Sequence, residues 1–435
     1  RKLCFMKTET LIIGAGLAGL TCARALQEQG HDFLLVEAEG EPGGRVRTQH
    51  KDGFLLDRGF QIFLEAYPEP QRWLDYDALH LKAFYPGAQI MGAQGPVLLG
   101  DPLRKPQDLF ATALAQVGSP LDKMKVLALR TYTQARSLEQ LWKSHETSTL
   151  SCLQQWGFSA AFIQQFFKPF LGGVFLDLSL STSSHLFYFV MKMFAEGRAV
   201  IPAKGMQQIP EQLARWIPEA QRLYHCRVTE WVSQGDGDRQ WHKLRLQREG
   251  HGLDCEARQV VVATDARQAQ QLLGAKVLPR QFNGSRTLYF ASDASPVDRP
   301  VLVLNGEAKG PVNHLVNLSL VSAAYAPAGQ HLLSLSVLGE ALEWPQDLLI
   351  EAVRAQMYRW FGVPCEWTLL EDMQLPYSLP VQHPPLLSQP SRTPLRATAG
   401  VIVGGDHTET GSIEGAMKAG RLMAQAVTQS VGASV

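Results

Sequence analysis

The chain has 435 residues and equal numbers of basic and acidic side chains, 41 Lys+Arg against 41 Asp+Glu, so its formal net charge is zero. This balance excludes the basic surface with which most proteins bind nucleic acid, and we expect no nucleic-acid partner. Hydrophobic residues make up 45% of the chain and charged residues 19%, which excludes a disordered or collagen-like chain and favours a large buried core. At roughly 150 residues per domain, the length predicts two to three domains.

The cysteines and the hydropathy bear on the cellular compartment. The six cysteines are widely spaced and form no Cys-x-x-Cys pair, which is typical of a reduced protein without a zinc site. No run of the sequence approaches the ~18 apolar residues that a membrane-spanning helix needs. The N-terminal segment lacks the apolar stretch of a signal peptide. We therefore expect a cytoplasmic protein with no metal site.

The first forty residues predict a β-α-β unit. The apolar run Thr10-Leu11-Ile12-Ile13 is typical of a buried parallel strand. Apolar residues then recur with helical spacing over 17–29, and Gly30 suits the end of that helix. The run Phe33-Leu34-Leu35-Val36 predicts a second strand that ends at Glu37.

The turn between the first strand and the helix matches the pattern Gly-x-Gly-x-x-Gly, with the residues Gly14, Ala15, Gly16, Leu17, Ala18 and Gly19. Gly14 permits the tight turn, Gly16 lets a pyrophosphate approach the backbone, and Gly19 lets helix and strand pack closely. Free N–H groups at the helix N-terminus favour the negative charge of that pyrophosphate. Glu37 stands where a carboxylate binds ribose hydroxyls, and it would repel a 2′-phosphate. Because the fingerprint occurs once, it predicts one bound dinucleotide.

Later segments predict the rest of the architecture. Strands are expected at 223–231, 260–263 and 401–403, and a last helix over 412–429. The first long insert is mostly helical, and the second mixes strand-like runs with one helix over 347–361. We predict an α/β fold in which a discontinuous Rossmann-type domain, formed by 6–80, 200–265 and 390–432, is interleaved with an α+β substrate domain, formed by 81–199 and 266–389.

A second group of motifs follows Glu37. Ala38 precedes Pro42-Gly43-Gly44-Arg45-Val46, and then comes Phe54-Leu55-Leu56-Asp57-Arg58-Gly59-Phe60. This series resembles the FAD-dependent amine oxidase superfamily, which includes protoporphyrinogen oxidases and carotenoid or squalene desaturases. In that family the Gly-Gly-Arg element lies along the FAD pyrophosphate, and the Asp-x-Gly segment passes the isoalloxazine. The resemblance implies a glutathione reductase-like FAD domain with contacts from the fingerprint and from Glu37, Ala38, Gly43, Gly44, Arg45, Val46, Gly59 and Phe60.

The resemblance continues in three distant segments. Pro202-Ala203-Lys204-Gly205-Met206 is similar to the family's re-entry into the FAD domain, and Val228 fits the strand residue whose backbone faces adenine. The stretch from Gly405 to Ala416 is similar to the family's closing motif. It implies that Asp406 lies at the ribityl–pyrophosphate end and that the N-terminus of the last helix stabilises the flavin N1–O2 edge. The implied contacts are Gly405, Asp406, Ser412, Ile413 and Ala416.

Two departures from the family pattern bear on the reaction. Amine-oxidising members carry a Tyr and a Trp at the positions of Ser412 and Glu409. The absence of these aromatic residues disfavours an amine oxidase without excluding it. No cysteine follows Cys365, so a C-terminal thioether to the flavin is ruled out and we expect non-covalent FAD. The closing motif is more similar to the desaturase-like branch that acts on isoprenoid lipids.

The first insert is rich in phenylalanine. Residues 158–194 hold nine of the chain's 19 phenylalanines. Such a cluster suits ordinary core packing, and it also suits an apolar tunnel for a polyene or a flat macrocycle. Within it, the stretch 186–194 carries Lys192 as its only charge, which makes it a candidate for peripheral contact with a membrane surface.

The resemblance thus implies an FAD-dependent oxidoreductase that removes a hydride from a C–H bond of a small apolar substrate to flavin N5, with oxygen or a quinone as electron acceptor. Three alternatives stay open: an amine or amino-acid oxidase, a flavin-dependent isomerase, and a non-catalytic flavoprotein partner. No catalytic acid or base is assigned. The ionisable candidates to test are His185, Lys204 and His407.

Overall fold

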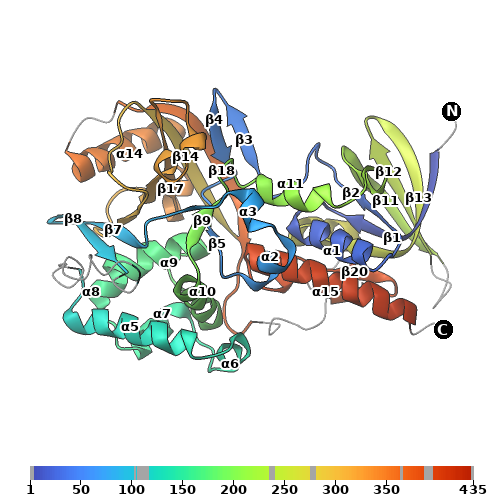
Figure 1. The fold of residues 1–435 in the computed structure, drawn as a ribbon, viewed down its shortest axis with the longest axis horizontal. Coiled ribbons are helices and arrows are strands. Elements are labelled where there is room, and N and C mark those ends of the chain that lie inside the picture. The colour runs from blue at the N-terminus through green and yellow to red at the C-terminus, as the bar shows by residue number, and fades with distance from the viewer. Residues whose placement is uncertain are drawn as a thin grey trace.

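The computed structural model describes residues 4–101, 104, 117–234, 241–274, 281–362, 366–386 and 395–432. Cys365 and the predicted boundary at residue 390 lie outside these ranges. The chain builds two large sheets, one of eight strands and one of seven, which lie at opposite ends of the molecule (Figure 1). The α/β class expected from the sequence is confirmed.

The eight-stranded sheet is centred on β1 (Cys4–Ile13), which pairs in parallel with β2 (Phe33–Val36) and with β13 (His251–Val262). Every residue of β2 is buried, because helices and loops cover both faces of this parallel part. The main path through the sheet runs β10-β2-β1-β13-β12-β11, and β20 joins β13 in parallel. The remaining strands are β10 (Arg222–Leu223), β11 (Cys226–Gln234), β12 (Trp241–Arg248), β19 (Leu395–Thr398) and β20 (Val401–Val403).

Two long helices pack together beside this sheet. They are α1 (Leu17–Glu28), which follows the glycine-rich turn, and α15 (Ile413–Gly432), the last helix of the chain. Figure 1 shows them side by side, although they come from the two ends of the sequence. A Cβ atom at Gly420 would overlap the carbonyl oxygen of Ala18, so this glycine allows the two helices to approach closely.

The seven-stranded sheet has the order β18-β14-β17-β16-β15-β7-β8. Helix α14 (Gln346–Phe361) covers one face with Leu349, Val353 and Met357. The other face turns toward the rest of the molecule and carries residues such as Tyr289, Leu304 and Val316 of the main core. The strands are β7 (Gly87–Gly92), β8 (Gly95–Gly100), β14 (Phe282–Ser292), β15 (Leu302–Asn305), β16 (Val312–Asn317), β17 (His331–Val337) and β18 (Thr368–Pro380).

A group of helices from the first insert packs below the seven-stranded sheet in Figure 1. Its central member is α10 (Ser184–Glu196), which is flanked by α5 (Pro120–Gln134). The other helices here are α6 (Leu138–Trp142), α7 (Thr149–Gln155), α8 (Ala160–Phe162) and α9 (Lys168–Phe175), with a π-helical turn over Ile163–Phe167.

Helix α10 corrects one expectation from the sequence. Most of its residues are buried, among them Leu186, Phe187, Phe189 and even Lys192, whose ammonium group donates to the Thr133 carbonyl oxygen. The stretch 186–194 is therefore core and does not present a face to a membrane. From the sequence alone this stretch is a candidate for membrane contact, because a helix buried in a protein core and a helix in contact with lipid are both apolar on most sides.

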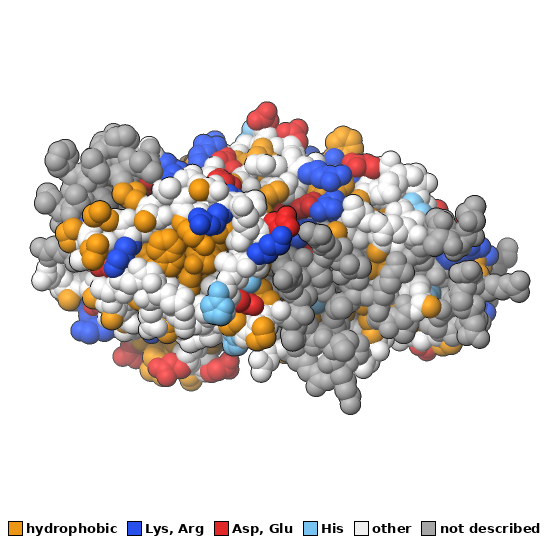
Figure 2. All heavy atoms as spheres, turned by 90° about the horizontal axis from the view of Figure 1, so that it is seen from below, with side chains coloured by type: hydrophobic (Ala, Val, Ile, Leu, Met, Phe, Trp, Pro, Cys, Tyr) orange, Lys and Arg blue, Asp and Glu red, His pale blue; other side chains and the backbone are white. Residues whose placement is uncertain are grey.

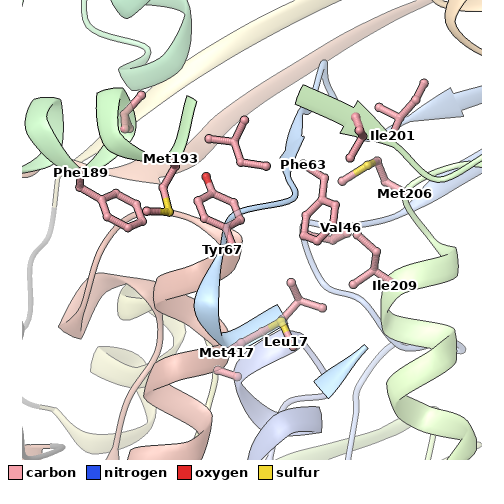
Figure 3. Packing of buried hydrophobic residues seen from close by; sticks show 14 of the residues in the cluster. Leu17, Val46, Phe63, Tyr67, Phe189, Met193, Ile201, Met206, Ile209 and Met417 are labelled. Carbon is pink, nitrogen blue, oxygen red and sulfur yellow. The ribbon is translucent and has the colours of Figure 1, made fainter. Parts of the chain in front are cut away.

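Short elements connect the two sheets. A three-stranded sheet in the order β5-β9-β6 lies at this junction, and β3 pairs with β4 in a hairpin. Figure 3 shows the core next to it, where Tyr67 stacks on Phe189 of α10 with ring centroids 5.9 Å apart. The short elements are β3 (Thr48–Lys51), β4 (Phe54–Asp57), β5 (Phe63–Leu64), β6 (Lys82–Ala83), β9 (Ala199–Ile201), α2 (Pro68–Trp73), α3 (Tyr76–Leu79), α11 (Gln208–Arg215), α12 (Ala266–Leu273) and α13 (Leu318–Val321).

Two further expectations differ from the structure. The single strand predicted at 223–231 is wrong, because the chain turns at His225, which has a φ of +54°, and divides into β10 and β11. The first insert is mostly helical, but it opens with the β7–β8 hairpin, which extends the seven-stranded sheet. Both inserts thus contribute strands to that sheet, while the division of the chain at the predicted domain boundaries stays a prediction.

Candidate functional site

The glycine-rich turn lies at the carboxyl end of β1. The Gly14 N–H donates to the Val36 carbonyl oxygen at 2.8 Å, and the φ of Gly14 is +104°, a conformation that favours glycine. A Cβ atom at Gly19 would overlap the carbonyl group of Gly14, so only glycine allows this packing. Helix α1 has Gly16 as its N-cap, without a side chain to satisfy the first N–H groups and with open space beside its Cα. The helix N-terminus is thus left available to an anion.

The carboxylate of Glu37 is fixed beside this turn. Its Oε2 accepts the Ala15 N–H at 2.7 Å, and its Oε1 accepts the Glu39 N–H at 2.9 Å. Glu37 and Ala38 are both half-buried at the end of β2. Strand β11 begins here, because the Cys226 N–H donates to the Glu37 carbonyl oxygen at 2.7 Å. Val228, two residues after Cys226 in β11, packs against the apolar cluster that includes Leu34 and Val36 of β2.

The Gly-Gly-Arg segment lies directly against the turn. Gly16 and Gly43 form a parallel bridge, and the Gly43 N–H donates to the Ala15 carbonyl oxygen at 2.9 Å. Gly43 and Gly44 have φ values of +127° and +60°. Val46 continues into the buried core near Leu17 (Figure 3).

Arg45 connects this segment to the closing motif. Its Nη2 lies 2.6 Å from Oδ1 of Asp406, and its Nη1 donates to the Ser378 carbonyl oxygen at 2.8 Å. The Asp406 side chain is 6% exposed, whereas that of Arg45 is 37% exposed. The guanidinium group therefore offers a free edge to a ligand while Asp406 holds it in place.

The closing motif brings a buried histidine to the same place. His407 is 7% exposed, and neither of its ring nitrogens has a hydrogen-bond partner in the part of the chain that the structure describes. Burial lowers the pKa of this imidazole, which keeps the ring neutral. A buried imidazole without partners fits a site that is completed by a polar ligand. Helix α15 begins just after it, with the Ser412 hydroxyl accepting the Gly415 N–H at 3.0 Å, and Ile413 and Ala416 pack against the main core.

The Gly59–Phe60 segment leads from these groups to the seven-stranded sheet. Gly59 has a φ of +81°, and a Cβ atom there would lie 2.7 Å from Leu375 of β18. The Gln61 side chain donates to the Arg45 carbonyl oxygen at 2.8 Å, which ties this segment to the Gly-Gly-Arg element. The Phe60 ring contacts Phe84, with centroids 6.2 Å apart.

Asp57 connects segments of the eight-stranded and the seven-stranded side of the molecule through hydrogen bonds. Its carboxylate accepts hydrogen bonds from the Thr48 hydroxyl at 2.6 Å, the Met206 N–H at 2.9 Å and the Tyr325 hydroxyl at 2.7 Å. The Tyr289 hydroxyl donates to the Asp57 carbonyl oxygen at 2.8 Å. Burial raises the pKa of Asp57 to about 6. These bonds join β3, β4, the segment at Met206 and the seven-stranded sheet, so Asp57 has a structural role.

A cavity of about 1100 Å³ lies next to Phe84, whose ring contacts that of Phe60. Ile62 and Phe84 are among its lining residues, and none of the fingerprint glycines is. Four phenylalanines of the first insert form part of its wall, namely Phe162, Phe166, Phe170 and Phe194. The other five, Phe158, Phe167, Phe175, Phe187 and Phe189, are buried in the core. Five of the nine phenylalanines are therefore core residues, and four line a cavity.

The three ionisable candidates are in different surroundings. His407 lies beside Asp406, as described. His185 has a structural role, because its Nε2 lies 2.9 Å from the Ser144 carbonyl oxygen and its ring packs on Trp142. Lys204 is exposed, and its N–H donates to the Gln208 side chain. The sequence did not point to His314 of β16, whose ring centroid lies 5.0 Å from that of Phe60. No sequence signal marks it.

The hydrogen bonds of Glu37, Gly43 and Arg45 bring the fingerprint, the Gly-Gly-Arg segment and the closing motif together into a candidate dinucleotide site. This arrangement defines a flavin-dependent oxidoreductase. The model of the family "Flavin containing amine oxidoreductase" matches residues 17–428, and the chain belongs to this family. It is thus an enzyme of the flavin-containing class, as the sequence motifs indicate.

Individual relatives cover less of the chain. Mitochondrial protoporphyrinogen oxidase of Nicotiana tabacum is 30% identical over 166 residues, 37% of this chain and 31% of that protein. A 15-cis-phytoene desaturase of an Oncidium hybrid cultivar is 44% identical over 64 residues, 14% of this chain and 11% of that protein. The chain thus spans about a third or less of the length of these two relatives. The crystal structure of a putative protoporphyrinogen oxidase from Exiguobacterium is similar over 98% of this chain and 99% of that one, with a TM-score of 0.70 and 16% identity, which shows a shared fold.

Within the described residues, none of the helices combines the length and the hydropathy required to cross a bilayer. Nor do the histidines, cysteines and acidic residues of that part of the chain gather into a cluster of three or more that would bind a metal ion.

Proposed function

We propose that the chain binds FAD non-covalently and oxidises a C–H bond of a small apolar substrate. The cavity carries this proposal. Aromatic and aliphatic side chains form most of its wall, and one of them, Phe84, contacts Phe60, which follows Gly59. At about 1100 Å³ the cavity is slightly larger than the roughly 300–1,000 Å³ of ordinary small-molecule sites.

The residues of the dinucleotide site suit FAD. Glu37 is positioned for ribose hydroxyls, the N-terminus of α1 and Arg45 for the pyrophosphate, and the N-terminus of α15 for negative charge on the reduced flavin. When bound, FAD accepts a hydride at N5 and passes the electrons to oxygen or a quinone. The protein's part is to orient the substrate in the cavity and to exclude water with the phenylalanine wall.

The position of Glu409 argues against the amine-oxidase alternative. In this chain its carboxylate is buried and pairs with Lys418 at 2.8 Å, so it provides no flat aromatic wall. Ser412 is occupied as the cap of α15. An aromatic cage for an amine would need side chains from other segments.

The test is anaerobic bleaching of the flavin absorbance of the purified protein by two panels of compounds. One panel contains primary amines, polyamines and amino acids, and the other contains dispersed carotenoids, squalene derivatives and porphyrinogens. We expect bleaching by the second panel alone, and bleaching by an amine would overturn the assignment. Acid precipitation of the same sample should release FAD into the supernatant, whereas flavin retained in the pellet would contradict non-covalent binding.

We also propose that peripheral membrane contact, if the substrate is a lipid, involves α5 and not α10. Leu121 and Met124 are 58% and 66% exposed on α5, and Met124 also lines the cavity, as do the basic residues Lys123 and Arg130. Figure 2 shows this side of the molecule, where hydrophobic side chains are exposed among Lys and Arg side chains. Exposed apolar side chains with basic neighbours favour an anionic lipid surface.

Vesicle flotation tests this contact. The double variant L121E/M124E should lose binding to phosphatidylserine-containing vesicles, while V232E, at an equally exposed residue of β11, should retain it. Equal binding by both variants would refute the assignment to α5.

A further inference from the structure

His314 presents a buried hydrogen-bond donor without a partner on the substrate side of the molecule. It lies in β16, is 4% exposed, and its Nε2 has no hydrogen-bond partner among the described residues. It belongs to the face of the seven-stranded sheet that carries Val316 and, on the neighbouring strand, its cross-strand partner Ser336. This is the face opposite α14.

The neighbours of the ring define its protonation. The Asn313 side chain donates to the Pro169 carbonyl oxygen at 2.9 Å, which fixes the orientation of its amide group. The same nitrogen lies 3.1 Å from Nδ1 of His314, so Nδ1 accepts its second N–H. Burial lowers the pKa of His314 to about 3, so the ring is neutral. A neutral imidazole that accepts at Nδ1 carries its proton at Nε2.

The surroundings of His314 link it to the cavity and to the flavin segments. The Phe60 ring contacts the His314 ring at 5.0 Å and the Phe84 ring at 6.2 Å, and Phe84 lines the cavity. Phe60 itself follows Gly59 in the segment that is tied to Arg45. On the other side, a Cβ atom at Gly173 of α9 would lie 3.0 Å from Nδ1, so a glycine makes room for the imidazole.

An unpaired buried N–H costs stability, and proteins retain such groups where a ligand completes them. The residues that surround the ring are uncharged: Asn313, Phe60, Gly173 and the cross-strand residues Leu304 and Ser336. A carboxylate at Nε2 would therefore be buried without a cation, which is unfavourable. The surroundings select an uncharged oxygen or nitrogen acceptor.

We propose that His314 is a substrate-binding residue whose Nε2–H donates a hydrogen bond to an uncharged acceptor atom of the substrate. The acceptor is a carbonyl oxygen, an ether oxygen or an unprotonated ring nitrogen. The substrate reaches Nε2 by displacing the Phe60 ring. This inference rests on the proposed function and narrows it. The enzyme prefers an apolar substrate that carries such an atom over a pure hydrocarbon of the same shape.

The test uses two probes of similar shape, 2-acetylnaphthalene and 2-ethylnaphthalene, which differ in a carbonyl oxygen. Their dissociation constants are measured from the change in flavin absorbance of the FAD-bound protein. We expect the parent protein to bind the acetyl compound about tenfold more tightly, which corresponds to one hydrogen bond. His314→Phe should bind both compounds equally, and His314→Gln, which keeps a donor, should restore part of the preference.

Thermal unfolding without ligand provides a second readout. Because His314→Phe removes the hydrogen bond that Nδ1 accepts from Asn313, a small fall in its unfolding temperature is expected, and a single cooperative transition shows that the variant is folded when its affinities are compared. The matched control Ser336→Ala should keep the preference for the acetyl compound. An equal affinity of the parent for both probes, or a preference that persists in His314→Phe, would overturn the inference. Loss of FAD from the purified parent would instead refute the proposed function, so the two failures are distinguishable.

Discussion

Arg45 joins two segments of the site that are distant in the sequence, and its replacement tests the assignment of the pyrophosphate position. Arg45→Met removes a guanidinium group that lies 2.6 Å from the Asp406 carboxylate. A hydrogen bond between charged groups contributes about 1.5–3 kcal/mol, and 1.4 kcal/mol corresponds to a factor of ten in affinity. We therefore expect the dissociation constant of FAD to rise about 10- to 100-fold.

The structure also predicts how this loss is partly reversed. In Arg45→Met the Asp406 carboxylate, 6% exposed, is left without its cation next to the phosphates. The double variant R45M/D406N removes that charge and should bind FAD about tenfold more tightly than R45M alone. Titration of the apoprotein with FAD, followed by the quenching of flavin fluorescence, measures both values. An affinity of R45M within threefold of the parent, or a double variant no better than R45M, would refute this placement of Arg45.

Two other predictions concern stability. Gly420→Val introduces side-chain atoms where the carbonyl oxygen of Ala18 lies, so it should lower the free energy of unfolding by about 2 kcal/mol in a urea titration, while a change of the exposed Gln425 to Val should have little effect. Burial raises the pKa of Glu414 to about 7 in the native state, whereas a glutamate in the unfolded state has a pKa of about 4.3. Between these two pH values the native state holds a proton that the unfolded state has lost. The free energy of unfolding therefore falls as the pH rises through this range. Glu414→Gln should reduce this fall by up to about 3 kcal/mol between pH 4.5 and pH 8, while Asp57, whose pKa is raised to about 6, still contributes to it. An unchanged slope would show that Glu414 does not cause the fall.

The segments of the candidate dinucleotide site could be predicted from the sequence because their conformations depend on local contacts. Glycine is required where a Cβ atom would overlap the backbone of another element or where φ is positive, as at Gly19 and Gly14, and such positions are visible in a short motif. The strands and helix around this turn follow from apolar runs of four residues and from helical spacing. Residues 10–36 therefore fold as the sequence predicts.

The substrate side could not be predicted in the same way because it depends on contacts between distant segments. His314 lies in a strand of mixed apolar and polar residues, and only the pairing of β16 with β17 and the approach of Phe60 reveal its position. The phenylalanine cluster gives no sequence signal that separates the rings in the cavity wall from those in the core. The burial of α10 likewise depends on the helices and strands that pack against it, which cannot be predicted from the sequence of α10 itself.

The central claim is that an apolar substrate reaches the flavin through the cavity. The most direct test narrows the cavity and measures the rate at which an apolar compound bleaches the flavin under anaerobic conditions. Ala195 lines the cavity, and Ala195→Trp should slow bleaching at least tenfold by the compound that reduces the parent fastest. Gln154→Trp, an exposed change on α7, should leave the rate unchanged. Equal rates in both variants, or bleaching by amines alone, would contradict the claim that an apolar substrate reaches the flavin through this cavity.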